Sequence, residues 1–337
     1  MKLASLKEGG RDGTLVIVSR DLKRATKVAD IAQTLQQALD NWSRVEGDLR
    51  RAGKRLHEIQ FDPIGAGRSF DLHPDRLAAP LPRAFQVFDG NAYLRHVQLV
   101  RQARGAAMPQ EYYAAPLMYQ ARSDGFFAPT EDLVFADETG GIDFEAEIAV
   151  IVDDVPAGVD REAAAKHIRL IMLANDVSLR NFIPDELAKG YGYLHGKPGL
   201  SFSPVAVTPD ELGPYWDGGK INLPLATHLN GRLFGNPSAG VDMDFDFPAL
   251  IAHAAKTRPL SSGTIIASGA VSNKNARVGS SCIAELRTLE TILSGRASTP
   301  FLKFGDHVRI EMVDGEGKSV FGAIEHRIRR AGDDSGA

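Results

Sequence analysis

Residues 142–152 read Ile-Asp-Phe-Glu-Ala-Glu-Ile-Ala-Val-Ile-Val, and this stretch decides the fold class. Alternate residues of a β-strand share a face, so the acidic side chains at 143, 145 and 147 point to one side of the predicted strand. The run then continues as four apolar residues, which predicts that the strand enters the protein interior. Like charges at the edge of a core repel each other unless a cation or a shared proton intervenes. A half-exposed strand with a solvated acidic face is the alternative, and alternation by itself favours it.

Short strands follow one another along most of the chain, whereas helical periodicity is confined to a few separated segments. The pattern predicts an α+β fold and argues against a doubly wound α/β sheet. Asn230-Gly231 lies between two apolar runs and is the strongest hairpin signal. A terminal hairpin is expected around Asp314-Gly315.

Apolar residues at helical spacing predict a helix over residues 31–51 and another over residues 89–105, with Asp89 or Asn91 as its N-cap. Residues 162–177 are expected to begin as a helix and to end in a short apolar run. Near the N-terminus, two short strands are expected on either side of the turn at residues 9–13.

A stretch rich in Pro, Gly and Asp, residues 61–82, has the composition of a linker. We therefore place a domain boundary near Leu77. This divides the chain into a small N-terminal α+β domain, residues 1–76, and a larger catalytic domain, residues 77–332.

The composition excludes several classes of protein. The 337 residues include 43% hydrophobic residues and carry a net charge of −4, which gives no indication of disorder, nucleic-acid binding or membrane-surface binding. No stretch has the roughly 18 apolar residues that span a bilayer, and no signal peptide is evident. Cys282 is the single cysteine, so an intrachain disulfide is impossible. We expect a cytoplasmic protein.

Asp176 follows the apolar run at residues 171–174, where a lone carboxylate is unusual. The simpler interpretation is a residue that caps a turn. Together with Glu145 and Glu147, however, it would form an oxygen-rich site without a cysteine or histidine cluster. Such a site suits Mg²⁺, Ca²⁺ or Mn²⁺ better than zinc.

Asp89 and His96 form a second constellation. If the helix that holds them is continuous, their seven-residue spacing leaves them on one face, offset by roughly 20°. The carboxylate could then join the metal while the imidazole takes a proton from water. The alternative for His96 is an ordinary surface histidine.

Four motifs, in this order and at this spacing, resemble the catalytic domain of the fumarylacetoacetate hydrolase family. They are E-x-E at 145–147, N-D-x-S-x-R at 175–180, G-K-P-G-L-S-F-S-P at 196–204 and S-G-T-I-I-A-S-G at 262–269. The resemblance implies a mixed β-sheet and β-roll catalytic domain. The first 76 residues resemble the extra N-terminal domain of true fumarylacetoacetate hydrolases, which favours fumarylacetoacetate as the substrate.

The resemblance also implies a role for individual residues. The metal ligands would be Asp89, Glu145, Glu147 and Asp176. The catalytic residues would be His96, Glu285 and Lys197. His96 would activate water, and Glu285 would orient the His96 ring. The substrate-binding residues would be Arg101, Tyr119, Tyr191 in place of a family tyrosine, and Ala270 where many relatives have a threonine.

The implied activity is hydrolysis of a carbon–carbon bond in a 1,3-diketo acid, fumarylacetoacetate giving fumarate and acetoacetate as in tyrosine and phenylalanine catabolism. The implied cofactor is Mg²⁺ or Ca²⁺, with Mn²⁺ as a third candidate, and the implied assembly is a homodimer. Alternatives within the superfamily are an acylpyruvate hydrolase, for example of fumarylpyruvate, a keto-acid decarboxylase, and a hydratase or isomerase. A non-catalytic metal-containing binding protein is the alternative from a different class.

Overall fold

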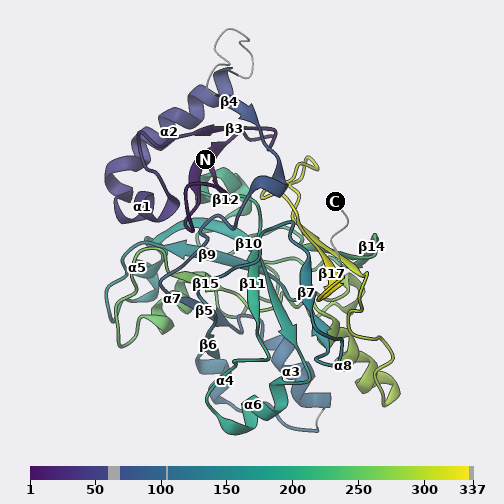
Figure 1. Ribbon diagram of the computed structural model, residues 1–337. Coiled ribbons are helices and arrows are strands. Elements are labelled where there is room, and N and C mark those ends of the chain that lie inside the picture. Colours follow the sequence, from purple (N-terminus) through teal and green to yellow (C-terminus); the bar gives the residue numbers. More distant parts are fainter. Residues whose placement is uncertain (60–68, 104, 334–337) are drawn as a thin grey trace.

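The computed structural model describes residues 1–59, 69–103 and 105–333, which form two β-sheets and the helices around them (Figure 1). The larger sheet runs, in spatial order, β4 (Ser69–Asp71), β3 (Arg24–Lys27), β2 (Thr14–Val18), β1 (Lys2–Leu6), β12 (Ala206–Val207), β10 (Ile168–Leu179), β9 (Ala146–Val152), β15 (Ile265–Ala267), β5 (Val87–Gly90) and β6 (Met118–Gln120). Two further strands, β8 (Ile142–Asp143) and β11 (Gly199–Phe202), also pair with β10. The smaller sheet runs β14 (Arg232–Gly235), β13 (Ala226–Leu229), β16 (His307–Glu311), β17 (Ile324–Arg330) and β7 (Leu133–Phe135).

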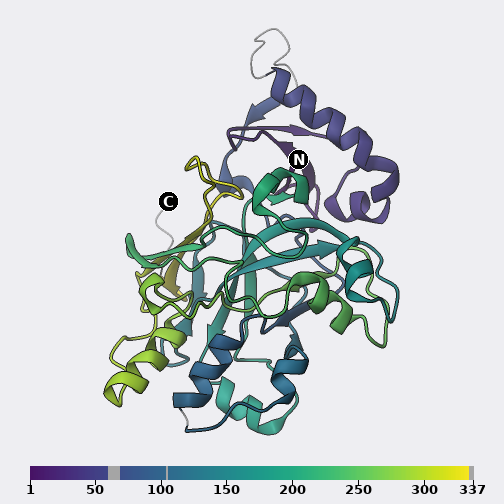
Figure 2. The same cartoon turned by 180° about the vertical axis from the view of Figure 1, so that it is seen from behind.

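The helices lie at the two ends of the larger sheet and beside it. They are α1 (Leu35–Asp40), α2 (Trp42–Ile59), α3 (Leu94–Ala103), α4 (Glu111–Ala114), α5 (Arg161–Ala165), α6 (Ile183–Lys189), α7 (Phe247–Ala254) and α8 (Ile283–Ser294). The N-terminal helices α1 and α2 lie at one end of the molecule and α3, α4 and α6 at the other, as Figures 1 and 2 show from opposite sides. Among the described residues, no helix combines the length and apolar character that a membrane crossing requires.

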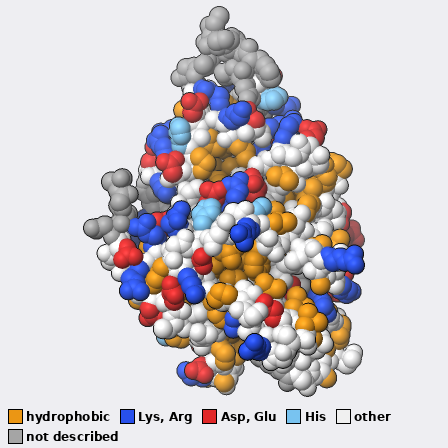
Figure 3. Space-filling view, turned by 90° about the vertical axis from the view of Figure 1, so that its right-hand side faces the viewer, with side chains coloured by type: hydrophobic (Ala, Val, Ile, Leu, Met, Phe, Trp, Pro, Cys, Tyr) orange, Lys and Arg blue, Asp and Glu red, His pale blue; other side chains and the backbone are white. Residues whose placement is uncertain are grey.

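Parallel and antiparallel neighbours occur in both sheets, which confirms the predicted mixed α+β architecture. In the larger sheet β15 pairs with β5 in parallel and with β9 in antiparallel orientation, and in the smaller one β17 pairs with β7 in parallel. On the face shown in Figure 3, basic and acidic side chains are interspersed, in keeping with 39 Lys and Arg against 43 Asp and Glu.

The decisive stretch at residues 142–152 is buried throughout, so the half-exposed acidic strand is wrong. Instead of one strand it forms β8 and β9, separated by Phe144 and Glu145. Ile148 and Val150 pack into one hydrophobic cluster and Ala149 and Ile151 into another, on the opposite face of the sheet. Strand β9 is therefore a central strand covered on both sides, as its continuous apolar run predicts.

The predicted helix-to-apolar segment at residues 162–177 becomes the short helix α5 followed by the long strand β10. Asp176 lies inside β10 and is fully buried, so its interpretation as a turn cap is wrong. Strand β11 supports β10 here, with Asp176 opposite Leu200. Strand β8 pairs a little further on, with Ser178 opposite Asp143.

At the N-terminal end, the two strands predicted beside the turn at residues 9–13 are β1 and β2. The single helix predicted over residues 31–51 is divided into α1 and α2. Helix α1 ends at Asp40 with Asn41 as its C-cap, and α2 begins at Trp42. Strand β4 lies within the predicted linker, whose residues 61–68 are outside the described ones. The larger sheet continues across the predicted boundary, since Lys2 of β1 pairs with Val207 of β12.

Both predicted hairpins are confirmed. Asn230 (φ 52°) and Gly231 (φ 75°) form the turn between β13 and β14, with positive φ angles at both central positions, as a type I′ turn requires. The terminal hairpin joins β16 and β17 through a longer loop, in which Val313 bridges Ser319.

Buried His326 on β17 makes the free energy of unfolding depend on pH. Its Nδ1 lies 2.7 Å from the Glu131 carbonyl oxygen, and burial lowers its pKa from 6.5 to about 4. Between pH 6.5 and pH 4 the unfolded chain therefore binds a proton at His326 that the folded chain does not bind. Stability is lost as the pH falls through this range. We expect this loss to reach roughly 3 kcal/mol.

Urea denaturation at several pH values measures this loss. His326→Asn keeps a donor for the Glu131 carbonyl but does not titrate, so its stability should change less steeply across that pH range. His73→Asn, at a solvent-exposed histidine, is the matched control. Parallel pH profiles for wild type and His326→Asn would contradict the assignment.

Candidate metal centre

Four buried carboxylates from three separate segments of the chain meet at one point of the larger sheet. Asp89 comes from β5, Glu147 from β9 and Asp176 from β10, while Glu145 lies at the break between β8 and β9. One ligand oxygen from each lies within 4.8 Å of the others. The four side chains are almost inaccessible, with exposed fractions between 0% for Glu147 and 6% for Glu145. This buried acidic cluster indicates a divalent metal site.

Unpartnered oxygens test whether a cation fits the cluster. Asp89 Oδ1, Glu147 Oε1 and Asp176 Oδ1 are buried and have no hydrogen-bond partner among the described residues. Buried carboxylate oxygens without a partner are costly, and each of the three belongs to a different member of the cluster. An all-oxygen donor set suits a hard divalent cation. The residues present therefore fit such an ion.

Burial and mutual repulsion disturb the protonation of the cluster. Burial raises the pKa of Asp89 well above its ordinary value, and the Asp176 carboxylate raises it further. Burial also raises the pKa of Glu147, with Asp89 adding to the effect. For Glu145 burial acts in the same direction, but Lys197 and Arg180 together hold its pKa below the ordinary value. Without a cation, Asp89 and Glu147 therefore retain protons more strongly than free carboxylates do.

Metal binding should accordingly release protons and strengthen as the pH rises. We expect about one proton or more to leave per ion bound, because a raised carboxyl pKa must be overcome before the oxygen can act as a ligand. Titration calorimetry of Mg²⁺ or Mn²⁺ into the EDTA-treated protein, in buffers of different ionisation enthalpy, counts these protons. Binding that releases none, with an affinity unchanged between pH 6 and pH 8, would contradict the cluster as the site.

Two further side chains contact the cluster. The Lys197 ammonium forms an ion pair with Asp176 and lies 3.1 Å from Glu145 Oε1. Burial would lower the pKa of Lys197, but the Asp176 and Glu145 carboxylates raise it above its ordinary value, so the group is cationic. The Tyr119 hydroxyl donates to Asp176 Oδ2 at 2.7 Å.

His96 and Glu285 form a dyad between α3 and α8. His96 Nδ1 lies 2.9 Å from Glu285 Oε2, and the exposed fractions of the two side chains are 15% and 4%. A carboxylate only accepts, so Glu285 favours the neutral tautomer that carries its proton on Nδ1. The other ring nitrogen, Nε2, then has a lone pair with which to accept a proton.

The predicted geometry that brought Asp89 and His96 together is wrong, although both line the same cavity. Asp89 lies on β5, and α3 begins only at Leu94, so the two residues do not share a helix face. Neither Asp89 nor Asn91 caps α3. Asp244, from a distant segment, accepts from the Leu94 backbone N–H at 2.8 Å.

Two residues that support the site were not assigned a role from the sequence. Asp143 accepts from the backbone N–H groups of Ile283 and Ala284 at 2.8 and 2.9 Å, which fixes the start of α8 just before Glu285. Arg180 donates to Asp143 at 2.8 Å and pairs with Glu145 at 2.6 Å. Both residues lie in motifs identified in the sequence, Asp143 in the acidic strand and Arg180 in N-D-x-S-x-R. Their place in these motifs was the sequence signal that could have indicated a role at the site.

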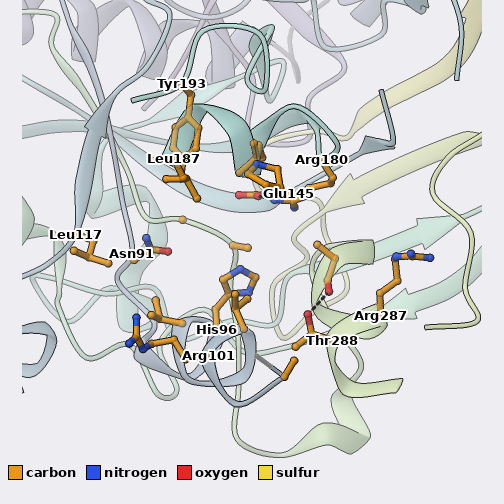
Figure 4. Close-up of a pocket in the computed structure, with 18 of the residues that line it drawn as sticks. Asn91, His96, Arg101, Leu117, Glu145, Arg180, Leu187, Tyr193, Arg287 and Thr288 are labelled. Carbon is orange, nitrogen blue, oxygen red and sulfur yellow. Dashed lines mark hydrogen bonds and ion pairs between the residues drawn. The ribbon is translucent and has the colours of Figure 1, made fainter. Parts of the chain in front are cut away.

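A cavity of about 530 Å³ opens beside the cluster (Figure 4). Of the residues expected there from the sequence, it is lined by Asp89, His96, Arg101, Tyr119, Glu145, Lys197 and Ala270. The prediction that Tyr191 binds the substrate is not supported, because this residue is 100% exposed and does not line the cavity. Tyr193 lines it instead and packs edge-on against Tyr119, with ring centroids 4.7 Å apart.

Comparisons with known proteins agree with this architecture. The family model described as "Fumarylacetoacetate (FAA) hydrolase C-terminal" matches residues 86–329, and "Fumarylacetoacetase N-terminal domain 2" matches residues 1–83. The crystal structure of maleylpyruvate hydrolase from Sphingobium sp. SYK-6, in complex with manganese(II) and pyruvate, has a TM-score of 0.62 at 16% identity and covers 98% of this chain and 99% of that chain. At that identity the likeness shows the fold alone.

Two curated relatives carry names of a different reaction. "Oxaloacetate tautomerase fahd2, mitochondrial" of Xenopus laevis is 28% identical over 159 residues, which are 46% of this chain and 47% of the frog protein. The match therefore spans about half of the frog protein's length. "Oxaloacetate tautomerase YisK" of Bacillus subtilis is 24% identical over 257 residues, or 66% of this chain and 80% of that protein. With family models matching nearly the whole length, the chain belongs to the fumarylacetoacetate hydrolase family.

Proposed function

We propose that this protein is a metal-dependent hydrolase that cleaves a carbon–carbon bond in a 1,3-diketo acid, with fumarylacetoacetate as its substrate. One observation carries the proposal: His96, which contacts Glu285, lines the same cavity as Asp89 and Glu145 of the acidic cluster. A base beside an electrophilic site is what the attack of water on a carbonyl carbon requires.

Asp89, Glu145, Glu147 and Asp176 would hold the cation, for which we propose Mg²⁺ or Ca²⁺, with Mn²⁺ as the third candidate. When bound, a divalent cation acts as a Lewis acid that polarises the carbonyl oxygens of a diketone. The chain's own residues then have to deliver water, stabilise negative charge and return a proton.

In the proposed reaction, His96 Nε2 accepts a proton from a water molecule while Glu285 holds the ring and stabilises its positive charge. The water oxygen forms a bond to one carbonyl carbon, and the Lys197 ammonium donates to the oxygen that becomes negative there. The bond to the central carbon then breaks, and its electron pair stays with the acetoacetate part. His96 returns its proton to that carbon. The products together contain the substrate plus one water.

Arg101 and Tyr119 are the proposed contacts for a substrate carboxylate. Arg101 lines the cavity from α3, and its guanidinium offers a planar set of donors that matches a carboxylate. Tyr119 lines the cavity next to the cluster, where its hydroxyl is held by Asp176.

The second candidate is oxaloacetate tautomerisation, which the names of the two relatives favour. It needs only a proton transfer between carbon and oxygen, so the same base would serve without an attacking water. Acylpyruvate hydrolysis and keto-acid decarboxylation are further outcomes within the family.

A spectrophotometric assay separates these candidates. The purified protein is treated with EDTA, supplied with Mg²⁺, Ca²⁺ or Mn²⁺, and offered fumarylacetoacetate, acylpyruvates or oxaloacetate. We expect a metal-dependent loss of fumarylacetoacetate absorbance, faster than that of any acylpyruvate. Turnover of oxaloacetate alone would replace the proposal by tautomerisation, and a metal-dependent thermal shift with diacids but no turnover would indicate a binding protein.

The homodimer stays a prediction, which light scattering would check.

A further inference from the structure

Two arginines line the cavity without a carboxylate partner. Arg101 on α3 donates from Nε to the Ala107 carbonyl at 2.6 Å, and Arg287 on α8 donates from Nη1 to the Thr299 carbonyl. Within the part of the chain that the structure describes, neither forms an ion pair with Asp or Glu. Arg180, the third arginine of the cavity, differs because Asp143 and Glu145 already neutralise it.

Both unpaired guanidiniums are held against an aromatic ring. The Arg101 guanidinium lies over the Tyr112 ring, 5.6 Å from its centroid, and that of Arg287 lies over the Phe301 ring at 4.3 Å. The ring and the backbone carbonyl together restrict the side chain, while the other N–H groups of each guanidinium have no partner among the described residues. Such preorganisation lowers the entropy lost when an anion binds.

The dyad joins the two helices that carry these cations. Arg101 follows His96 on α3, Arg287 follows Glu285 on α8, and the His96–Glu285 contact joins the two helices. In Figure 4 the Arg101 and Arg287 side chains lie on opposite sides of His96. Thr288, Ala297 and Phe301 extend the cavity lining around Arg287. A ligand anchored at both ends would therefore place its middle beside the dyad.

We propose that Arg287 forms a second carboxylate subsite, opposite Arg101, and that the cavity selects linear diacids whose reacting carbonyls lie between the two carboxylates. The inference rests on the proposed function and narrows its substrate class. Fumarylacetoacetate carries a carboxylate at each end of its diketone, whereas a simple acylpyruvate such as acetopyruvate carries one. Oxaloacetate also has two carboxylates, but the carbon chain between them is much shorter than in fumarylacetoacetate.

The test is the ratio of kcat/KM for fumarylacetoacetate to kcat/KM for acetopyruvate. Loss of a charge-assisted hydrogen-bond pair should lower this ratio about 10- to 100-fold in Arg287→Gln, through KM of the diacid rather than kcat. Arg287→Lys should restore part of this ratio, because lysine keeps the positive charge but lacks the paired N–H donors of the guanidinium. Arg296→Gln, at an exposed arginine beyond the end of α8 that does not line the cavity, is the control and should leave the ratio unchanged.

A binding measurement separates failure of this subsite from failure of the proposed function. Calorimetry of the Mg²⁺-loaded protein compares suberate, a diacid with the chain length of fumarylacetoacetate, with octanoate. We expect the wild type to bind suberate about tenfold or more tightly and Arg287→Gln to lose that preference. If the preference depends on Arg287 but no diketo acid is hydrolysed, the subsite stands and the proposed function falls. If hydrolysis occurs and Arg287→Gln leaves both ratios unchanged, the subsite is overturned.

Discussion

Replacing His96 by glutamine is expected to lower kcat for the diketo acid by about 10²- to 10⁴-fold, the usual contribution of a general base. Glutamine can still donate a hydrogen bond to Glu285 but cannot accept a proton from water. Because His96 is not a member of the acidic cluster, calorimetry should show unchanged Mg²⁺ affinity. The same variant would also stop a tautomerase, so the substrate assay must come first.

The matched control for this substitution is His195→Gln. His195 is two residues before Lys197, which lines the cavity, but its own side chain is 67% exposed and lies against Glu186. We expect kcat to stay within about twofold of the wild type, as is usual for surface substitutions. A His96→Gln enzyme that keeps full activity would remove this histidine from the mechanism.

Glu147→Gln should abolish metal-dependent turnover and yet stabilise the metal-free protein. Glu147 Oε2 accepts from the Gly269 N–H at 3.1 Å, a bond that an amide oxygen can keep, while Oε1 has no partner among the described residues. Losing a charged ligand should lower kcat by about 10³-fold or more, since the cation supplies several kcal/mol to the transition state.

The stabilisation follows from the raised pKa of Glu147. A carboxyl whose pKa is higher in the folded state costs stability as the pH rises from the unfolded-state value, and glutamine does not titrate. Without metal, the variant should therefore be more stable than the wild type, and by more at pH 8 than at pH 5. Urea denaturation measures both, with Glu162→Gln on the exposed face of α5 as the control. A variant that binds Mg²⁺ as tightly as wild type would exclude Glu147 as a ligand.

Local sequence signals predicted much of the fold. The apolar run in β9 and the Asn230-Gly231 turn depend on side-chain periodicity and on φ angles, which neighbouring residues determine. The length of β10 could not be predicted in this way. Its last residues are held as a strand by β8 and β11, which lie far away in the sequence. Asp176 therefore looked like the end of an element although it lies inside one.

The site was predictable to a different extent. The four carboxylates and the His96–Glu285 contact were anticipated through the family resemblance, and the structure brings these residues together. Reasoning from a single helix misplaced Asp89, because the turn after β5 has no periodicity to read. The exchange of Tyr191 for Tyr193 has a similar cause, since both lie in the loop after α6, where side-chain direction depends on tertiary contacts.

The pairing of β1 with β12 has a consequence for how this protein unfolds. Strand β12 also hydrogen-bonds β10, the strand that carries Asp176, so the first strand of the chain is two ladders away from the acidic cluster. If β1 unfolded, β12 would lose a neighbouring strand and would expose backbone groups beside β10. We therefore expect the N-terminal strands and the acidic cluster to belong to one cooperative unit and to unfold together.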